Sequence, residues 1–345
     1  MLTILLQTRK PMKRQGQLLE QIADLNNLYK AFYKAQKGKH SKPYVFAFRK
    51  QLQVNLQRLK YQITSGVVET GNYHTFTIYD PKKRLICATP FAQRVLHHAL
   101  MNVCHASFEN HQIASSFASR SGKGTYAALD KARHYNQRYR WFLKLDVRKY
   151  FESIDHAILK QQLHRLFKDQ SLLLLFGQII DSYSTAGQKS VPIGNLTSQY
   201  FANHYLSVAD YYVKQVLQVP AYVRYMDDMV LWHHDKKALL AMGYRFQEFI
   251  ARELLLLLKP FCLNENRKGL PFLGYLLYEK QVRLAPRSKK RFVATSLLYD
   301  AHLQTGLWSQ KQFANHVMPL VAFTEYANAR EFRKNVYSTL VASEE

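Results

Sequence analysis

The chain has 345 residues, of which 47% are apolar, so it can bury a substantial core arranged in two or three structural units. Lysine and arginine total 49 against 24 aspartate and glutamate, a net charge of +25. This excess favours a nucleic-acid partner over a membrane surface or a merely soluble basic protein. No apolar run approaches the roughly 18 residues that a membrane span needs.

The number and spacing of the cysteines indicate the cellular compartment and argue against disulfide and zinc sites. The chain has three cysteines, Cys87, Cys104 and Cys262, and none forms a C-x-x-C pair. We therefore expect neither a disulfide framework nor a zinc knuckle. We expect a reducing, cytoplasmic location instead.

The first part of the chain is predicted to be helical and the next part to contain a hairpin. Apolar residues recur at helical spacing from Leu18 to Tyr29 and again from Val45 to Leu59, with a basic loop at 37–43 between them. The runs 74–79 and 84–88 are typical of two strands joined by a basic turn. Residues 91–108 are predicted to be helical.

The segment 115–125 is rich in small and basic residues and leads into a predicted helix at 126–135. It lacks the spacing of a P-loop, but backbone amides and two cations near a helix start can hold phosphates. A surface turn is the alternative. Farther along, Asp155 precedes a helix expected to end near Phe167, and we predict that it caps this helix rather than acting in catalysis.

The second half of the chain alternates helices and short strands. The stretch 191–199 opens a helix that Thr197 or Ser198 would cap. The later elements are expected to be a helix at 238–258 whose last five residues are buried core, a short hairpin at 272–278 and 281–284, and basic, aromatic helices from 286 to 345.

Tyr225-Met226-Asp227-Asp228 places two adjacent carboxylates between two apolar, β-prone runs, at a predicted hairpin tip. Aspartate is depleted in strands, so these two are either turn residues or part of a metal site. A third carboxylate, Asp146, ends the apolar run that begins at Trp141. Three carboxylates at strand ends can hold two divalent ions roughly 3.5–4 Å apart for phosphoryl transfer. Magnesium suits such oxygen ligands best.

The order of these motifs resembles that of a reverse transcriptase across roughly residues 70–284. The residues that carry the resemblance are the loop with Arg120, the strand-borne Asp146, Pro192-Ile193-Gly194, Tyr225-Met226-Asp227-Asp228 and Phe272-Leu273-Gly274-Tyr275. The resemblance implies an α+β right-hand polymerase whose small antiparallel palm sheet is backed by helices. Residues 1–69 would be an N-terminal helical extension, 70–284 the fingers and palm, and 285–345 a helical thumb.

The resemblance also implies roles for single residues near the carboxylates. Asp146, Asp227 and Asp228 match the metal ligands of two Mg²⁺ ions, which Mn²⁺ can replace, with the Val147 carbonyl as an extra ligand. Phe151 matches a steric gate that crowds a 2′-hydroxyl and so favours deoxynucleotides; the alternative is a core aromatic.

Further matches concern the substrates. Tyr225 would help to place the primer end, and Ile193 and Gly194 would contact the incoming nucleotide. Arg84 and Arg120 match finger cations that hold the triphosphate, a task that suits arginine. Lys83 at the hairpin tip is either a helper or a solvated side chain. Lys259 matches the lysine that protonates pyrophosphate, with Lys268 as its rival. The implied partners are template RNA, an RNA–DNA hybrid and deoxynucleoside triphosphates.

The stretch from Pro192 to Gln199 looks like that of the enzymes of diversity-generating retroelements, because Ile193 stands where intron-encoded and retroviral enzymes usually carry glutamine. This implies copying of a template-repeat RNA with misincorporation opposite adenine, and a small basic accessory protein as partner. Two alternatives stay open: another bacterial reverse transcriptase, of the phage-defence or truncated group II intron type, and a non-catalytic RNA-binding module with a polymerase fold.

Overall fold

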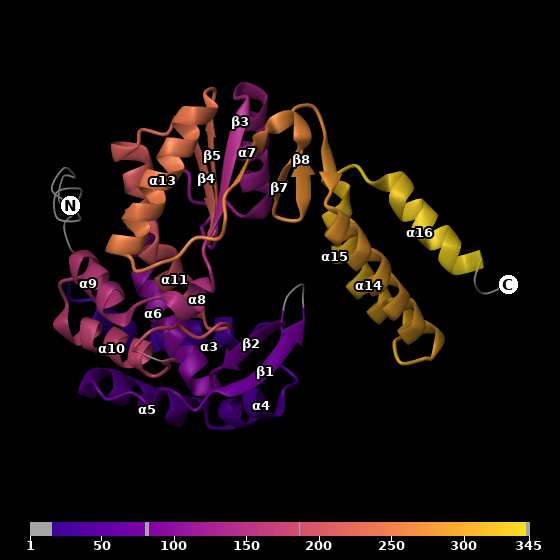
Figure 1. The fold of residues 1–345 in the computed structure, drawn as a ribbon. Helices are drawn as coiled ribbons and strands as arrows, with labels where there is room; N and C mark the ends of the chain where they lie inside the picture. Colours follow the sequence, from indigo (N-terminus) through magenta and orange to yellow (C-terminus); the bar gives the residue numbers. More distant parts are fainter. Residues whose placement is uncertain (1–15, 80–82, 186, 343–345) are drawn as a thin grey trace.

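The structure is a computed structural model that describes residues 16–79, 83–185 and 187–342. Figure 1 shows three groups of elements: the N-terminal helices with α6, α9, α10 and the β1–β2 hairpin in the lower part, the palm strands above them, and α14 to α16 at the right. Residues 1–15 and the predicted hairpin turn at 80–82 lie outside the described residues. Among the described residues, no helix is both long and apolar enough to cross a membrane.

The N-terminal helices form where their apolar spacing predicts them, and they pack against the fingers. They are α2 (Leu19–Ala23), α3 (Leu25–Gln36), α4 (Pro43–Lys50) and α5 (Leu52–Ser65). Their buried side chains, among them Leu28 and Phe32, belong to the same hydrophobic cluster as those of α6 (Phe91–His111) and of one face of the palm sheet. The N-terminal helices therefore share a core with α6 and the palm sheet.

The predicted finger hairpin is confirmed: β1 (His74–Tyr79) pairs antiparallel with β2 (Lys83–Ala88). The loop at 115–125 leads into α7 (Thr125–Arg138), and α8 (Tyr150–Ser153) follows the first palm strand. Asp155 caps α9 (His156–Leu166), as predicted, because its side chain accepts a hydrogen bond of 3.1 Å from the amide of Ile158. Helix α10 (Gln170–Asp181) completes this part.

The palm is a four-stranded antiparallel sheet in the order β4-β5-β3-β6, and it is backed by helices as expected. Its strands are β4 (Ala221–Tyr225), β5 (Asp228–His233), β3 (Trp141–Asp146) and β6 (Cys262–Glu265). One face, with Leu143 and Leu145, packs against α13 (Lys236–Glu253). The other face, with Phe142 and Trp232, packs against α7 and a second, three-stranded sheet. Because both faces are covered, the strands read as nearly continuous apolar runs.

The C-terminal part contains more strands than expected and three helices. The second sheet is built from β7 (Leu270–Phe272), β8 (Tyr275–Leu277) and β9 (Val282–Leu284). The predicted strand at 272–278 is interrupted because Leu273 and Gly274 both adopt positive φ and reverse the chain. The predicted helices beyond it are confirmed as α14 (Pro286–Gln304), α15 (Gln310–Glu325) and α16 (Arg330–Ala342).

Two predicted helix boundaries are wrong. Helix α11 (Leu196–Tyr205) begins after Asn195, whose side chain makes no cap. Thr197 and Ser198, the predicted caps, lie buried inside the first turn. The helix is continued by α12 (Ser207–Tyr211) and a π-helical turn. Helix α13 ends at Glu253 instead of Leu258. The chain leaves the helix there because 257–259 pairs with 146–148 through two backbone hydrogen bonds of 2.8 Å. As a result Leu255 and Leu257 are exposed rather than in the core.

Candidate active site

The Asp227–Asp228 pair lies at a very tight hairpin. Strands β4 and β5 pair up to Tyr225 and Asp228, so only Met226 and Asp227 form the loop. Met226 has a φ of +56°, in the left-handed region that two-residue hairpin loops need and that side chains other than glycine rarely adopt. The backbone is thus held in a costly conformation at the position predicted to be catalytic.

The sheet register brings the third carboxylate beside this pair. Asp146 and Asp228 are directly opposite each other as the last pair of β3 and β5. Residues opposite one another in an antiparallel pair carry their side chains on the same face, with Cβ atoms roughly 4.5–5.5 Å apart. Tyr225 is the partner of Asp228 on the other side, and its hydroxyl accepts a 3.1 Å hydrogen bond from the Thr125 hydroxyl. The three predicted carboxylates therefore lie at one end of the sheet.

The environment of Asp228 destabilises its charge. Burial, with smaller contributions from Asp227 and Asp146, raises its pKa to about 6 against the opposing effect of Lys144. The Lys144 ammonium lies 3.1 Å from one Asp228 oxygen, Oδ2. The other oxygen, Oδ1, is buried and has no hydrogen-bond partner. A carboxylate oxygen without a partner in a desolvated position is what a divalent ion would satisfy.

Asp227 and Asp146 differ in how they are compensated. Burial raises the pKa of Asp227, as does Asp146, whereas Lys259 and Arg84 lower it. Asp146 is ion-paired with Lys259 at 2.7 Å, Oδ1 to Nζ. Lysines thus balance the carboxylates in this arrangement.

The carboxylate oxygens of Asp146, Asp227 and Asp228 are suitable ligands for divalent ions, although these side chains do not converge on one point. Among the described residues, no group of three or more His, Cys, Asp or Glu side chains is arranged to hold a metal ion. Lys259 and Lys144 each occupy one carboxylate oxygen, of Asp146 and of Asp228 respectively. Asp146, Asp227 and Asp228 would hold the metal once these lysines give way. Val147 pairs with Leu258 in a bridge whose hydrogen bonds use the carbonyl of Asp146 and the amide of Arg148, so its own carbonyl takes no part.

Lys259 reaches the site because its backbone is fixed there. Its amide donates to the Asp146 carbonyl at 2.8 Å, beside the side-chain ion pair. Its rival, Lys268, follows β6 at the end where that strand pairs with Trp141, the opposite end of β3 from Asp146. The structure therefore favours Lys259 of the two candidates.

Three other predicted residues lie on adjacent segments. The Val191 amide donates to the Phe151 carbonyl at 2.9 Å, and the Cys87 amide donates to the Ile193 carbonyl at 2.8 Å. Gly194 has a φ of +114°, and a Cβ built there would lie 2.9 Å from Cγ2 of Ile86. Helix α8, the loop at 191–194 and β2 are thus in direct contact.

The side chains on these segments keep their predicted roles open. Phe151 is partly buried against the core, which is compatible with either a gate or a packing role. Arg84, on β2, is exposed, and its charge lowers the pKa of Asp227. Both assignments stay predictions.

The Arg120 side chain is engaged by groups of the protein itself. It is only 9% exposed and is ion-paired with Glu109 at 2.8 Å. It also donates to the carbonyls of Ser116, at 3.1 Å, and Ile113. Lys123 likewise donates to the carbonyls of Ala114 and Ser116. These cations hold the 115–125 loop together, so the structure gives no support to a triphosphate role for Arg120.

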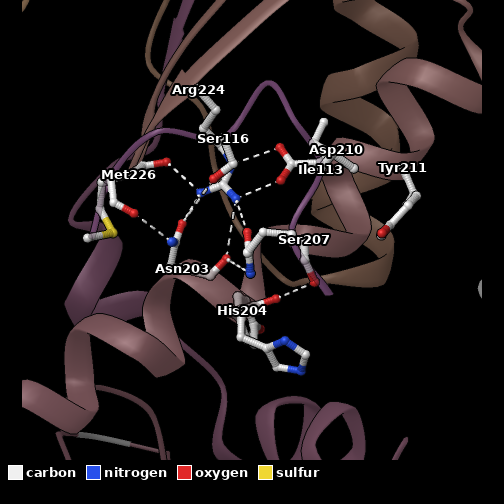
Figure 2. Close-up of polar contacts among 12 residues, drawn as sticks. Ile113, Ser116, Asn203, His204, Ser207, Asp210, Tyr211, Arg224 and Met226 are labelled. Carbon is white, nitrogen blue, oxygen red and sulfur yellow. Dashed lines mark hydrogen bonds and ion pairs between the residues drawn. The ribbon is translucent and has the colours of Figure 1, made fainter. Parts of the chain in front are cut away.

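A buried network behind the hairpin was not anticipated from the sequence. Arg224 makes a bidentate ion pair with Asp210, at 2.7 and 2.6 Å, and both side chains are 0% exposed. Its other nitrogen, Nη1, donates to the Asn203 side chain at 2.7 Å and to the Met226 carbonyl at 3.1 Å, as Figure 2 shows. Burial alone would lower the pKa of Arg224, but Asp210 raises it above its usual value. The guanidinium therefore ties the turn at Met226 to α11 and α12. The only signal in the sequence was an arginine inside an apolar strand.

A comparison with protein-family models agrees with this geometry. The family model described as reverse transcriptase (RNA-dependent DNA polymerase) matches residues 77–275, more than half of the chain and all three carboxylates. No curated protein matches the chain. A similar solved structure is apo telomerase from Candida tropicalis, truncated from its C-terminal domain, with a TM-score of 0.46 and 11% identity over 63% of this chain and 55% of that chain. The family match over the palm and its carboxylates identifies the chain as a member of the reverse transcriptase (RNA-dependent DNA polymerase) family.

Proposed function

We propose that this RNA-directed DNA polymerase extends a DNA primer on an RNA template by phosphoryl transfer at Asp146, Asp227 and Asp228. The observation that carries the proposal is the register of the palm sheet, which sets Asp146 opposite Asp228 and next to the hairpin. The unpartnered Oδ1 of Asp228 supports a divalent ion as the missing partner. Three clustered carboxylates would repel RNA, which argues against a purely RNA-binding module.

The reaction would join the primer 3′-oxygen to the α-phosphorus of the nucleotide while the bond to the β-phosphate oxygen breaks. The 3′-hydroxyl loses its proton, and pyrophosphate leaves. Two divalent ions, with Mg²⁺ as the candidate, would supply a lowered hydroxyl pKa and charge neutralisation when bound to the carboxylates. Lys259, whose ammonium lies 2.7 Å from Asp146, would give its proton to the leaving pyrophosphate.

The test is primer extension by the double variant Asp227→Asn, Asp228→Asn. It should abolish synthesis and leave RNA binding nearly intact, because the substitutions keep the shape and remove only the charges that hold the ions. The matched control is Glu20→Gln with Glu248→Gln, which removes two exposed carboxylates away from the hairpin. A double variant that still extends a primer would refute the metal assignment.

Sugar selection is assigned to Phe151. The contact of its backbone with the 191–194 loop supports this role. We expect Phe151→Ala to admit ribonucleotides and Phe151→Tyr to keep the wild-type preference. If Phe151→Ala discriminated between deoxynucleotides and ribonucleotides as well as the wild type does, Phe151 would have only a packing role.

The more specific proposal is that the chain acts in a diversity-generating retroelement, copying a template-repeat RNA into cDNA mutated at adenines, with a small basic accessory protein as partner. It is supported by Ile193, which offers an apolar contact where glutamine could hydrogen-bond. Apolar contacts discriminate less steeply than buried polar pairing. Ile193→Gln should lower the error rate opposite template adenine, and Ile193→Leu should not. An unchanged error rate in Ile193→Gln, or flanking DNA without a template and variable repeat pair, would favour a different bacterial reverse transcriptase.

A further inference from the structure

His156, the first residue of α9, is a buried side chain to which the proposed reaction gives no part, since it is only 1% exposed. Its Nε2 lies 2.7 Å from the Ser190 carbonyl oxygen, and its Nδ1 lies 3.2 Å from a carboxylate oxygen of Asp181, the last residue of α10. A carbonyl oxygen only accepts hydrogen bonds, so Nε2 donates this one. Asp181 is in turn ion-paired with Lys160 at 2.5 Å. The imidazole therefore joins α9 and α10, which lie side by side in Figure 1, to the chain at Ser190.

The backbone at Ser190 is strained and buried. Its φ is +97°, a value that residues other than glycine rarely adopt, and Gln188 has a φ of +53°. Strain of this kind persists only where the surrounding structure holds it. Ser190 is 1% exposed, so water cannot replace a donor that its carbonyl loses. The hydrogen bond from His156 therefore supports a residue that would otherwise be expected to relax.

The strained residue lies beside the segment that carries Phe151 and shortly before Ile193. The Ser190 amide donates to the Ile154 carbonyl at 2.9 Å, and the Val191 amide donates to the Phe151 carbonyl at 2.9 Å. Ile193 follows two residues after Val191. A change in the Ser190 backbone would therefore redirect the chain just before it reaches Ile193.

We infer that His156 is a positioning residue for the nucleotide site: its hydrogen bond to Ser190 holds the backbone from which Ile193 and Gly194 extend. The inference rests on the proposed polymerase function, in which Ile193 and Gly194 contact the incoming nucleotide. The ring is itself buried, so it acts through the loop at 191–194 and not on the substrate. Without this bond the Ser190 backbone can relax, and the nucleotide then meets a loop that is displaced or less well ordered.

The test is steady-state primer extension by two variants of the full chain at His156. His156→Leu removes the donor and keeps a side chain of similar bulk, whereas His156→Gln keeps an amide nitrogen that can donate to the Ser190 carbonyl. We expect His156→Leu to raise the KM for deoxynucleotide about tenfold, because a buried carbonyl loses its donor. The kcat should stay within about threefold of the wild type, and His156→Gln should return the KM to within about threefold.

The matched control separates positioning from a general loss of stability. Leu28→Ala removes core packing in α3 at a side chain that is 0% exposed. It should lower the melting temperature and leave the KM within about twofold of the wild type. A raised KM in His156→Leu that His156→Gln restores and Leu28→Ala does not show supports the inference. A wild-type KM in His156→Leu, or a rise that His156→Gln or Leu28→Ala shows equally, would assign His156 to packing and overturn it.

A second variant keeps the test decisive if His156→Leu does not fold. Asp181→Ala then takes its place, because the Asp181 side chain is 51% exposed and contacts the Nδ1 side of the ring. A KM raised about threefold supports the inference, and a wild-type KM overturns it. Failure of the proposed function looks different: a wild-type chain that extends no primer would remove the polymerase role, whereas an active chain whose variants keep the wild-type KM would remove the role of His156 alone.

Discussion

Two ion pairs at the proposed active site differ in their exposure to water. Behind the hairpin, Arg224 and Asp210 are both 0% exposed. Beside β3, Lys259 and Asp146 are 39% and 35% exposed. A buried charge must have its partner, because the penalty for leaving it alone is several kcal/mol, whereas an exposed pair exchanges its partner for water at little cost. The first pair is therefore suited to hold the turn, and the second to let go of its carboxylate when a metal or a phosphate arrives.

The largest effect is expected from breaking the buried pair. Arg224→Met should lower the free energy of unfolding by about 3–5 kcal/mol, because Asp210 would keep a buried charge without a partner. Urea denaturation measures this change. Adding Asp210→Asn should restore part of the loss, since no charge is then left alone. A single variant as stable as the wild type would contradict the role given to the network.

The second-largest effect is a dependence of the free energy of unfolding on pH, which the raised pKa of Asp228 predicts. Its pKa rises from 3.8 to about 6 through burial, so the folded, metal-free chain binds this proton more tightly than the unfolded chain does. Stability from this group is complete below the unfolded pKa and is lost as the pH rises through about 6. The urea midpoint of the metal-free protein should fall more steeply in this range for the wild type than for Asp228→Asn. Identical slopes would sink the prediction.

The same linkage affects the metal. Because only the ionised carboxylate binds a cation, the Mg²⁺ concentration for half-maximal primer extension should rise as the pH falls below about 6. A titration of Mg²⁺ at several pH values measures this, and a constant requirement would mean that Asp228 does not ligate the ion.

Breaking the half-exposed pair should affect stability least among the active-site changes. Lys259→Met is expected to change the free energy of unfolding by less than about 1 kcal/mol, because water replaces the lost partner. Urea denaturation beside Arg224→Met makes the comparison direct. A loss as large as that of Arg224→Met would show that the two pairs do not differ as their exposure indicates.

The smallest change in stability is expected for an exposed ion pair at the start of α8. Lys149 and Glu152 are 77% and 53% exposed, so Lys149→Met should leave the free energy of unfolding within about 0.5 kcal/mol of the wild type. A larger change in either direction would point to the strained backbone at Lys149 rather than to its charge.

The sequence predicted the elements that carry their own pattern. The apolar run ending at Asp146, the hairpin around Asp227 and Asp228, and the Asp155 cap are local features, and all are present. The antiparallel palm sheet came from the family resemblance and is also confirmed.

Local sequence patterns did not predict features that depend on contacts between distant parts of the chain. Leu254–Leu258 has the composition of a helix, but pairing with the end of β3 draws it away. Arg120 stands in a loop that looks suited to phosphate, but Glu109 and nearby carbonyls take its guanidinium. Nothing in the sequence connects Arg224 with Asp210, because their contact depends on how α12 packs behind β4.

Gly194 lies where the β1–β2 hairpin contacts the loop at 191–194. Its missing side chain lets the finger hairpin seat directly on the loop that carries Ile193, 2.9 Å from where a methyl group would be. The Ile193 carbonyl accepts a hydrogen bond from Cys87 on β2, the strand that also carries Arg84, so a shift of the hairpin would affect both residues. The roles proposed for Ile193 in fidelity and for Arg84 in holding the triphosphate would then be coupled through this contact.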